Sequence, residues 1–184
     1  MADFIRFKQN VIDMLQEQQE KLGYQRETVR LYYPLESLNH LLGVSEGREG
    51  MRNLLKKFRE HAPELGALRF SEKAERFCII VPPEGAEYVH REVPQNLFLK
   101  GLLDLVSDHD TTLEQVRAYF LSSSDRVEER RMEEEFDLLL YFPDGVPDSY
   151  YYCLKQEGSH IFYHRFMRED YLSFGFRESD RPDR

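Results

Sequence analysis

Apolar residues recur at steps of three and four in three stretches of the first half of the chain, which is the spacing of one helix face. The pattern predicts helices over residues 3–22, 35–42 and 51–62. Gly23 and Gly43 follow the first two stretches, and glycine readily takes the left-handed conformation that ends a helix. The first half is therefore predicted to contain three helices, each with one apolar face.

Short stretches rich in β-branched and aromatic residues separate and follow these helices. Residues 28–33 alternate in this way before Pro34, which lacks a backbone donor, so a short strand is predicted there. Two further strands are predicted on either side of the polar link 71–76, ending at Pro82 and Pro83. Six apolar residues are predicted to share one core: Phe4, Val11, Leu38, Leu54, Phe58 and Ile79.

The second half repeats the order of helices before strands. After a predicted loop over 84–95, one helix is expected around 97–106 and another from a capping box of Thr111 and Glu114. Residues 136–142 are apolar on both faces, which is typical of a central strand. A hairpin is predicted over 150–166, with Glu157 and Gly158 in the turn, Lys155 opposite His160, and Tyr151 opposite His164.

These elements together predict an α+β protein. Over residues 3–81 the order and length of the elements, helix, strand, helix, helix and β-hairpin, resemble a winged-helix domain. The resemblance implies that the third helix would enter the major groove of DNA. We expect a winged-helix-like unit over 1–93, then helices and an antiparallel aromatic-rich sheet over 94–176. That second part is either a separate domain or a continuation of the first, and a charged, frayed tail over 177–184 follows.

The net charge of −9 is concentrated in the second half of the chain. Residues 1–93 carry 14 Lys and Arg against 15 Asp and Glu, whereas residues 94–184 carry 11 against 19. Acidic proteins repel phosphate backbones, so nucleic acid is disfavoured as a partner, although a local basic patch would keep it open as an alternative.

The chain carries no signal for a membrane or for export. Its longest apolar runs have five residues, far fewer than the roughly 20 that span a bilayer. Charged residues interrupt the first 22 positions, where a signal peptide would need an apolar core. Cys78 and Cys153 lie in apolar strand-like runs and are expected to be buried free thiols. These features predict a cytoplasmic protein without a membrane partner.

A basic stripe on the third helix is the strongest candidate for a binding site. It consists of Arg48, Arg52, Lys56 and Arg59, at spacings of four, four and three. In a winged helix this stripe would face DNA. The predicted wing, residues 72–76, is charge-balanced, which argues against DNA contact and favours a solvated or protein-facing stripe.

Other polar residues have simpler interpretations. Asp108, His109 and Asp110 precede a helix start, where acidic and polar side chains stabilise the helix. His160 and His164 would lie about 13 Å apart on a strand, too far to share one metal ion. No phosphate-binding glycine loop, zinc spacing or nucleophile elbow occurs in the sequence. We expect no cofactor and no metal.

Nine aromatic residues lie within 27 positions near the end of the chain: Tyr150, Tyr151, Tyr152, Phe162, Tyr163, Phe166, Tyr171, Phe174 and Phe176. Most are expected in the core, and those on an outer face would suit a protein interface. The sequence therefore favours a non-catalytic protein-interaction or self-association module, whose partner is another protein or a second copy. A DNA-binding regulator using the basic stripe is the alternative, and an enzyme with a site built from scattered residues such as His109, Asp110 or His164 is the minor one.

Overall fold

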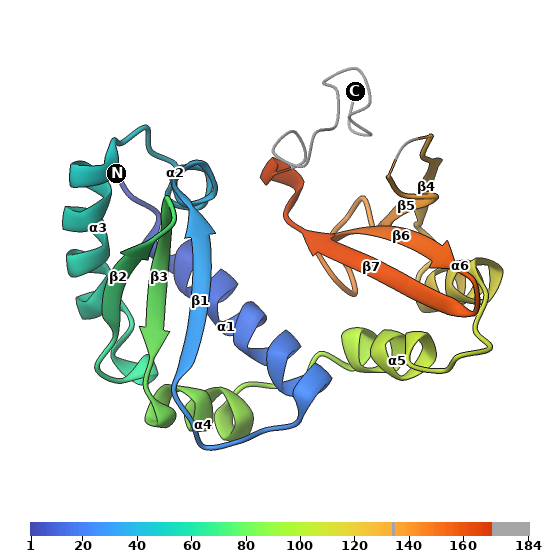
Figure 1. Cartoon of the computed structure of the whole chain (residues 1–184), viewed down its shortest axis with the longest axis horizontal. Helices are drawn as coiled ribbons and strands as arrows, with labels where there is room; N and C mark the ends of the chain where they lie inside the picture. Colours follow the sequence, from blue (N-terminus) through green and yellow to red (C-terminus); the bar gives the residue numbers. More distant parts are fainter. Residues whose placement is uncertain (134, 171–184) are drawn as a thin grey trace. The chain divides into compact units, whose positions relative to one another are not determined.

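The structure, a computed structural model, describes residues 1–133 and 135–170. Helices and antiparallel sheets make it an α+β protein, as predicted (Figure 1). The chain divides into two compact units, Met1–Gln95 and Asn96–Arg184, which are described separately as unit 1 and unit 2. Tyr171, Phe174, Phe176 and the predicted frayed tail over 177–184 lie outside the described residues.

Unit 1 follows the predicted order of helix, strand, helix, helix and hairpin, and then adds a helix. Its elements are α1 (Phe4–Leu22), β1 (Val29–Pro34), α2 (Leu35–Leu42), α3 (Arg48–His61), the 3-10 helix η1 (Pro63–Leu65), β2 (Arg69–Lys73), β3 (Arg76–Val81) and α4 (Pro83–Glu92). The winged-helix assignment itself stays a prediction.

The predicted loop over 84–95 is wrong, because most of that segment forms α4. Pro83 occupies the first turn of α4, where a missing backbone N–H costs no intrahelical bond. Only Gly85, Ala86 and Val89 of this helix are buried, so the apolar repeat that identifies a helix is weak in the sequence.

The three strands of unit 1 form an antiparallel sheet in the order β1-β3-β2. The ring of Phe7 in α1 lies 5.8 Å from the ring of Tyr33 in β1 and 4.4 Å from that of Phe58 in α3. These contacts place α1 and α3 on the face of the sheet that carries Tyr33, and α1 passes behind β1 in Figure 1. Val11, Leu38, Phe58 and Ile79 are fully buried, as predicted, whereas Phe4 and Leu54 are half-buried.

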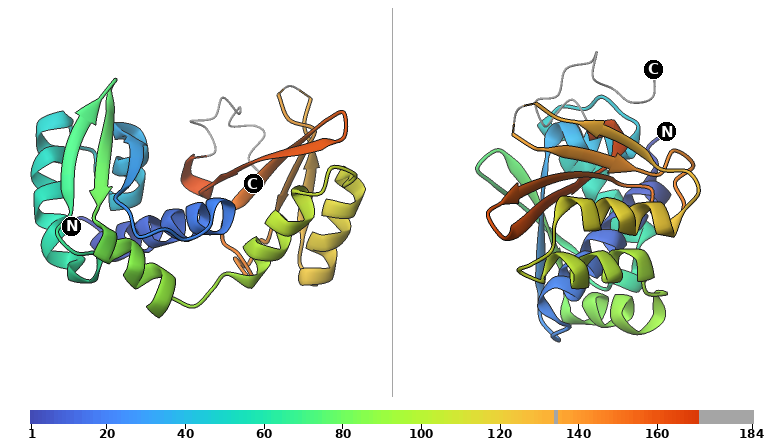
Figure 2. Two further views of the ribbon diagram at one scale, coloured as in Figure 1. Left: turned by 60° about the horizontal axis from the view of Figure 1, so that its bottom comes forward. Right: turned by 90° about the vertical axis from the view of Figure 1, so that its right-hand side faces the viewer.

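Unit 2 contains two helices and a four-stranded antiparallel sheet. The elements are α5 (Leu97–Val106), α6 (Leu113–Ser123), β4 (Glu128–Arg131), β5 (Leu138–Tyr141), β6 (Tyr151–Glu157) and β7 (His160–Phe166), and the strand order is β4-β5-β6-β7. The rings of Phe98 in α5 and Phe120 in α6 lie 5.9 and 5.4 Å from the ring of Tyr152. Both helices therefore cover the Tyr152 face, and Figure 2 shows them on one side of the strands.

Two local predictions in unit 2 need correction. The capping box consists of Thr112 and Gln115, because the Thr111 hydroxyl instead donates to the Leu105 carbonyl at 2.7 Å. The β6–β7 turn lies one residue later than predicted, since Gly158, at φ +62°, is its first residue. The predicted partners therefore change. His160 lies opposite Glu157 and His164 opposite Cys153, while Lys155 pairs with Phe162 and Tyr151 with Phe166.

Both cysteines are buried and free, as predicted. Within the ranges that the structure describes, no helix combines the length and apolar character that crossing a bilayer requires.

Candidate binding surface

One face of the sheet in unit 1 points away from the helices, because successive side chains of a strand lie on opposite faces. Tyr33 and its cross-strand partner Phe77 face the helices, so the residues that alternate with them face outward. The register arranges the outward residues in three rows: Arg30, Ile80 and Arg69; Tyr32, Cys78 and Ser71; Pro34, Arg76 and Lys73. We call these nine residues the open sheet face.

Four of the nine outward residues are cations: Arg30, Arg69, Lys73 and Arg76. All four are exposed, and no carboxylate occupies any other outward position. Their side chains form no ion pair or hydrogen bond within residues 1–133 and 135–170. Given strands about 4.8 Å apart and a rise of about 6.7 Å per two residues, the backbone positions of these four residues span roughly 10 by 13 Å. Four like charges this close repel one another, so an anion bound among them would be stabilised.

Tyr32 adds an aromatic surface to the open sheet face. It lies in the middle row, beside the buried Cys78, and its side chain is 44% exposed. Arg30 precedes it by two residues on the same strand, so the guanidinium and the ring share the face. The open sheet face therefore combines unpaired positive charge with an accessible ring.

The β2–β3 turn fixes the position of two of the cations. Ala74 and Glu75 adopt φ angles of +47° and +64°, the left-handed pair that a tight two-residue hairpin turn requires. This turn places Lys73 directly opposite Arg76 at the end of the ladder. Neighbouring like charges are unfavourable across a strand pair, which makes this end of the sheet a site that a bound anion would relieve.

The predicted basic stripe lies on α3, but the structure pairs half of it with one carboxylate. Arg52 donates from Nε to Oε1 of Glu72, and from Nη2 to Oε2 of Glu72 at 3.2 Å. Arg48 lies with Nη1 4.0 Å from the same Oε2. These bonds raise the pKa of Arg52 and lower that of Glu72. Glu72 therefore neutralises much of the charge at the beginning of the stripe.

The other two residues of the stripe are Arg59, which contacts an aromatic ring, and Lys56, which is exposed to solvent. The guanidinium of Arg59 lies 5.7 Å from the centre of the Phe70 ring, a distance typical of a cation–π contact. Lys56 is exposed and forms no ion pair with any residue that the structure describes. Of the four predicted residues, Lys56 and Arg59 therefore have no carboxylate partner among the residues that the structure describes.

Sequence reasoning missed the open sheet face because it counted the predicted wing as one charge-balanced segment. The sheet register separates these charges by face: Glu72, opposite Phe77, points toward α3, whereas Lys73 and Arg76 point outward. The signal was present in the alternation of the strands, because all four cations occupy positions of the same face and no carboxylate does.

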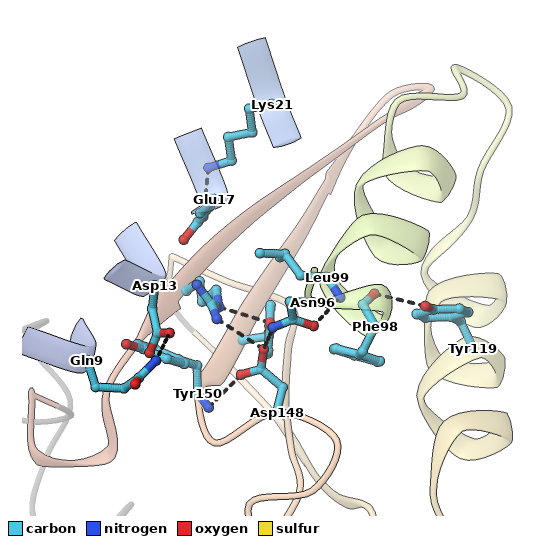
Figure 3. A network of polar contacts seen from close by, with 12 residues as sticks. Gln9, Asp13, Glu17, Lys21, Asn96, Phe98, Leu99, Tyr119, Asp148 and Tyr150 are labelled. Atoms are coloured by element: carbon cyan, nitrogen blue, oxygen red, sulfur yellow. Dashed lines mark hydrogen bonds and ion pairs between the residues drawn. The ribbon is translucent and has the colours of Figure 1, made fainter. Parts of the chain in front are cut away.

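Unit 2 contains a buried polar cluster that the sequence did not indicate. Asp148 accepts a hydrogen bond from the Tyr150 backbone N–H at 2.8 Å, and Asn96 Nδ2 donates to Oδ2 of Asp148 at 2.8 Å (Figure 3). Arg165 donates from Nη2 to the same oxygen at 3.0 Å and from Nε to the Tyr152 hydroxyl at 3.0 Å. Its guanidinium also lies 3.9 Å from the centre of the Tyr150 ring.

The cluster links three segments of unit 2 that are distant in sequence. Asn96 is the N-cap of α5 and accepts a hydrogen bond from the Leu99 N–H at 2.9 Å, while Asp148 precedes β6 and Arg165 lies in β7. The side chains of Arg165 and Asp148 are only 2% and 1% exposed. Because both oxygens of Asp148 accept from donors of the protein, the cluster is built to hold the fold of unit 2.

The residues considered for catalysis are spread over unit 2. Asp108 accepts from the Asp110 backbone N–H at 3.1 Å within the α5–α6 connection, and the ring of His109 lies 4.6 Å from that of His160. His164 faces the rings of Phe136 and Phe166. The part of the chain that the structure describes contains no group of three or more His, Cys, Asp or Glu residues suited to a metal ion.

Burial raises the pKa of the Cys153 thiol to about 12, with a smaller contribution from Glu135. A thiol with so high a pKa holds almost no thiolate near neutral pH, and the thiolate is the nucleophilic form. Its position in β6, fully buried, is that of a structural cysteine.

Comparison with known proteins gives one match. A family model described as "Domain of unknown function, E. rectale Gene description (DUF3877)" matches residues 4–175, a range that includes most of both units. No curated protein and no solved structure matches the chain. Because the model extends over nearly the whole sequence, the chain belongs to the DUF3877 family.

Proposed function

We propose that the protein is a non-catalytic binding module of the cytoplasm, and that the open sheet face is its docking surface for an anionic macromolecule. The observation that carries this proposal is the set of four unpaired cations, Arg30, Arg69, Lys73 and Arg76, with no carboxylate among the outward positions. Buried free thiols at Cys78 and Cys153 support a reducing compartment.

Two kinds of anionic macromolecule have the charge that this face attracts. One is an acidic protein segment, which would make the protein an interaction module; residues 94–184 of a second copy, with 11 basic and 19 acidic residues, are an example that would give self-association. The other is a nucleic acid. Both would replace repulsion among the four cations by attraction, and both complexes would weaken as salt screens the charges.

Charge reversal on two surfaces tests the proposal. The test variant is Arg30→Glu with Arg76→Glu, and the matched control is Lys56→Glu with Lys57→Glu on α3, which changes the net charge equally at exposed positions. Binding is measured by fluorescence anisotropy with a labelled poly-glutamate and a labelled oligothymidylate, each about 20 units long, at about 50 mM salt.

We expect the wild type and the α3 control to bind at least one probe, and the sheet variant to bind neither. Circular dichroism melts of the three proteins verify that all are folded. The proposal is wrong if the wild type binds neither probe, or if the α3 control loses as much affinity as the sheet variant.

A further inference from the structure

We propose that the anionic macromolecule on the open sheet face is a single-stranded nucleic acid, an inference that rests on the proposed function. Three features of the surface identify this class of partner: the type of cation, the exposed ring and the width of the sheet. Each of these observations bears on a different part of a nucleotide chain.

The type of cation fits phosphate. Three of the four cations on the face are arginines, whose planar guanidinium donates two parallel hydrogen bonds to one phosphate group. The cations lie on all three strands, so a strand of nucleic acid crossing the sheet would meet positive charge along its path. Within the portion of the chain that the structure describes, their side chains have no carboxylate partner to displace.

The exposed ring fits a base. Tyr32 is 44% exposed between the rows that carry the cations, and a base can stack on an aromatic ring of any sheet that displays one. A stacked base at Tyr32 would place its flanking phosphates toward Arg30 in one row and Arg76 in the other. An acidic peptide has carboxylates for the cations but no comparable use for the ring.

The width of the sheet disfavours a duplex. The major groove is about 12 Å wide and admits one helix or a two-stranded ribbon. In unit 1 the ring and Arg30 belong to β1, on the other side of β3 from β2. With outer strands about 10 Å apart before their side chains are added, all three strands cannot enter a groove together. A single strand laid across the face reaches every row.

The chain's net charge of −9 sets the strength of this interaction. At physiological salt, charges are screened beyond about 8 Å. The four cations therefore attract a strand in contact with them, while repulsion between its phosphates and the acidic residues elsewhere in the chain is partly screened. The affinity should therefore be modest and depend steeply on salt. Counterion release from a single strand contributes a slope of about −0.7 per neutralised phosphate, which gives about −2.8 for four cations.

The experiment measures the salt slope and the role of the ring. With oligothymidylate, a slope of about −2.8 means that affinity falls roughly 50-fold between 50 and 200 mM salt. Arg30→Ala with Arg76→Ala should reduce this loss to roughly sevenfold, whereas Lys56→Ala with Lys57→Ala on α3 should leave it unchanged. Tyr32→Ala should weaken binding by roughly five- to 150-fold, and Tyr32→Phe should retain most of the affinity because it keeps the ring.

Poly-glutamate distinguishes the failure of this inference from the failure of the proposed function. If poly-glutamate binds as tightly as oligothymidylate, or if Tyr32→Ala leaves oligothymidylate affinity unchanged, the face recognises acidic chains in general and the nucleic-acid inference is overturned. Tighter binding of duplex DNA than of the single strand would overturn it as well. If neither probe binds to the wild type, the docking surface itself is wrong.

Discussion

Arg165 and Asp148 form an ion pair in unit 2 at an Nη2–Oδ2 distance of 3.0 Å, with side chains that are 2% and 1% exposed. Burying two charges is expensive, and their attraction offsets the cost only when their remaining donors and acceptors are also bonded. Asp148 meets this condition through Asn96 and the backbone of Tyr150. Together with Asn96, the pair therefore connects the start of α5, the segment before β6 and the end of β7.

Removing the carboxylate should destabilise unit 2 strongly. Asp148→Ala takes away the anion facing a buried guanidinium and the acceptor of two further hydrogen bonds, so we expect a loss of about 3–5 kcal/mol in unfolding free energy. Urea unfolding followed by tyrosine fluorescence measures it. The control is Glu157→Ala, which breaks the exposed Lys155–Glu157 pair and should change the midpoint little. Equal midpoints for Asp148→Ala and the wild type would show that the buried pair does not hold the unit together.

The Arg52–Glu72 bond should make the stability of unit 1 depend on pH in acid. The hydrogen bond from Arg52 lowers the pKa of Glu72 in the folded state. The carboxylate therefore stabilises the fold above its unfolded pKa, about 4.3, and this contribution is lost as pH falls through the lower folded value. Glu72→Gln should be less stable than the wild type at pH 7, and the difference should shrink in acid.

Thermal melts between pH 7 and pH 3 test this expectation. Glu75→Gln is a matched control, because it removes the same charge from the same hairpin without breaking an ion pair among the residues the structure describes. If the gap between Glu72→Gln and the wild type is constant with pH, the bond from Arg52 does not form in solution.

The sequence predicts the order of elements in unit 1 as far as the hairpin because α1, α2 and α3 have strongly periodic apolar faces. Val11, Leu38, Phe58 and Ile79 could be assigned to the core for this reason. The helix α4 escaped prediction since its buried face consists of Gly85, Ala86 and Val89, which give a weak apolar signal. The apolar repeat of a sequence therefore identifies a helix only where the buried face carries large apolar side chains.

The candidate sites depend on which residues meet across the fold, and this is harder to read from one sequence. The α3 cations could be identified by their helical spacing, but their pairing with Glu72 depends on how the β2–β3 hairpin lies against α3. The contact between Arg165 and Asp148 joins positions 17 residues apart through the β6–β7 pairing, and neither residue stands out in its local sequence.

Cys153 should resist thiol reagents in the native protein. Burial raises its pKa to about 12, so the reactive thiolate is scarce and the side chain is inaccessible as well. Ellman's reagent should label neither Cys153 nor the buried Cys78 until denaturant is added. Rapid labelling of one thiol in native buffer would contradict the buried assignment, and Cys78→Ala identifies which cysteine reacts.

The same pKa predicts a loss of stability in alkali. The unfolded thiol ionises near pH 8.5, whereas the folded thiol stays protonated up to about 12. The stabilisation is therefore fully present below about pH 8.5 and is lost as pH rises toward the folded value. Urea midpoints of the wild type should fall over this range more steeply than those of Cys153→Ala, which starts lower because a buried sulfur is lost. Parallel curves would mean that Cys153 does not ionise differently on unfolding.

Duplex DNA should not bind through α3 at physiological salt. A recognition helix needs free donors for phosphates and bases, but Arg52 is hydrogen-bonded to Glu72 and Arg48 is directed at the same carboxylate. Lys56 and Arg59 are left among the four predicted contacts, and two phosphate contacts contribute a salt slope of only about −1.8. Non-specific binders have dissociation constants of about 10⁻⁴ to 10⁻⁶ M under these conditions, so we expect no shift of labelled duplex at micromolar protein and about 0.15 M salt.

Glu72→Gln gives a sharper form of the same test, because it releases Arg48 and Arg52 and should increase any weak duplex binding seen at low salt. A salt-sensitive duplex complex of the wild type that Lys56→Ala with Lys57→Ala abolishes, and that Arg30→Ala with Arg76→Ala retains, would instead make α3 the recognition helix of a DNA-binding protein.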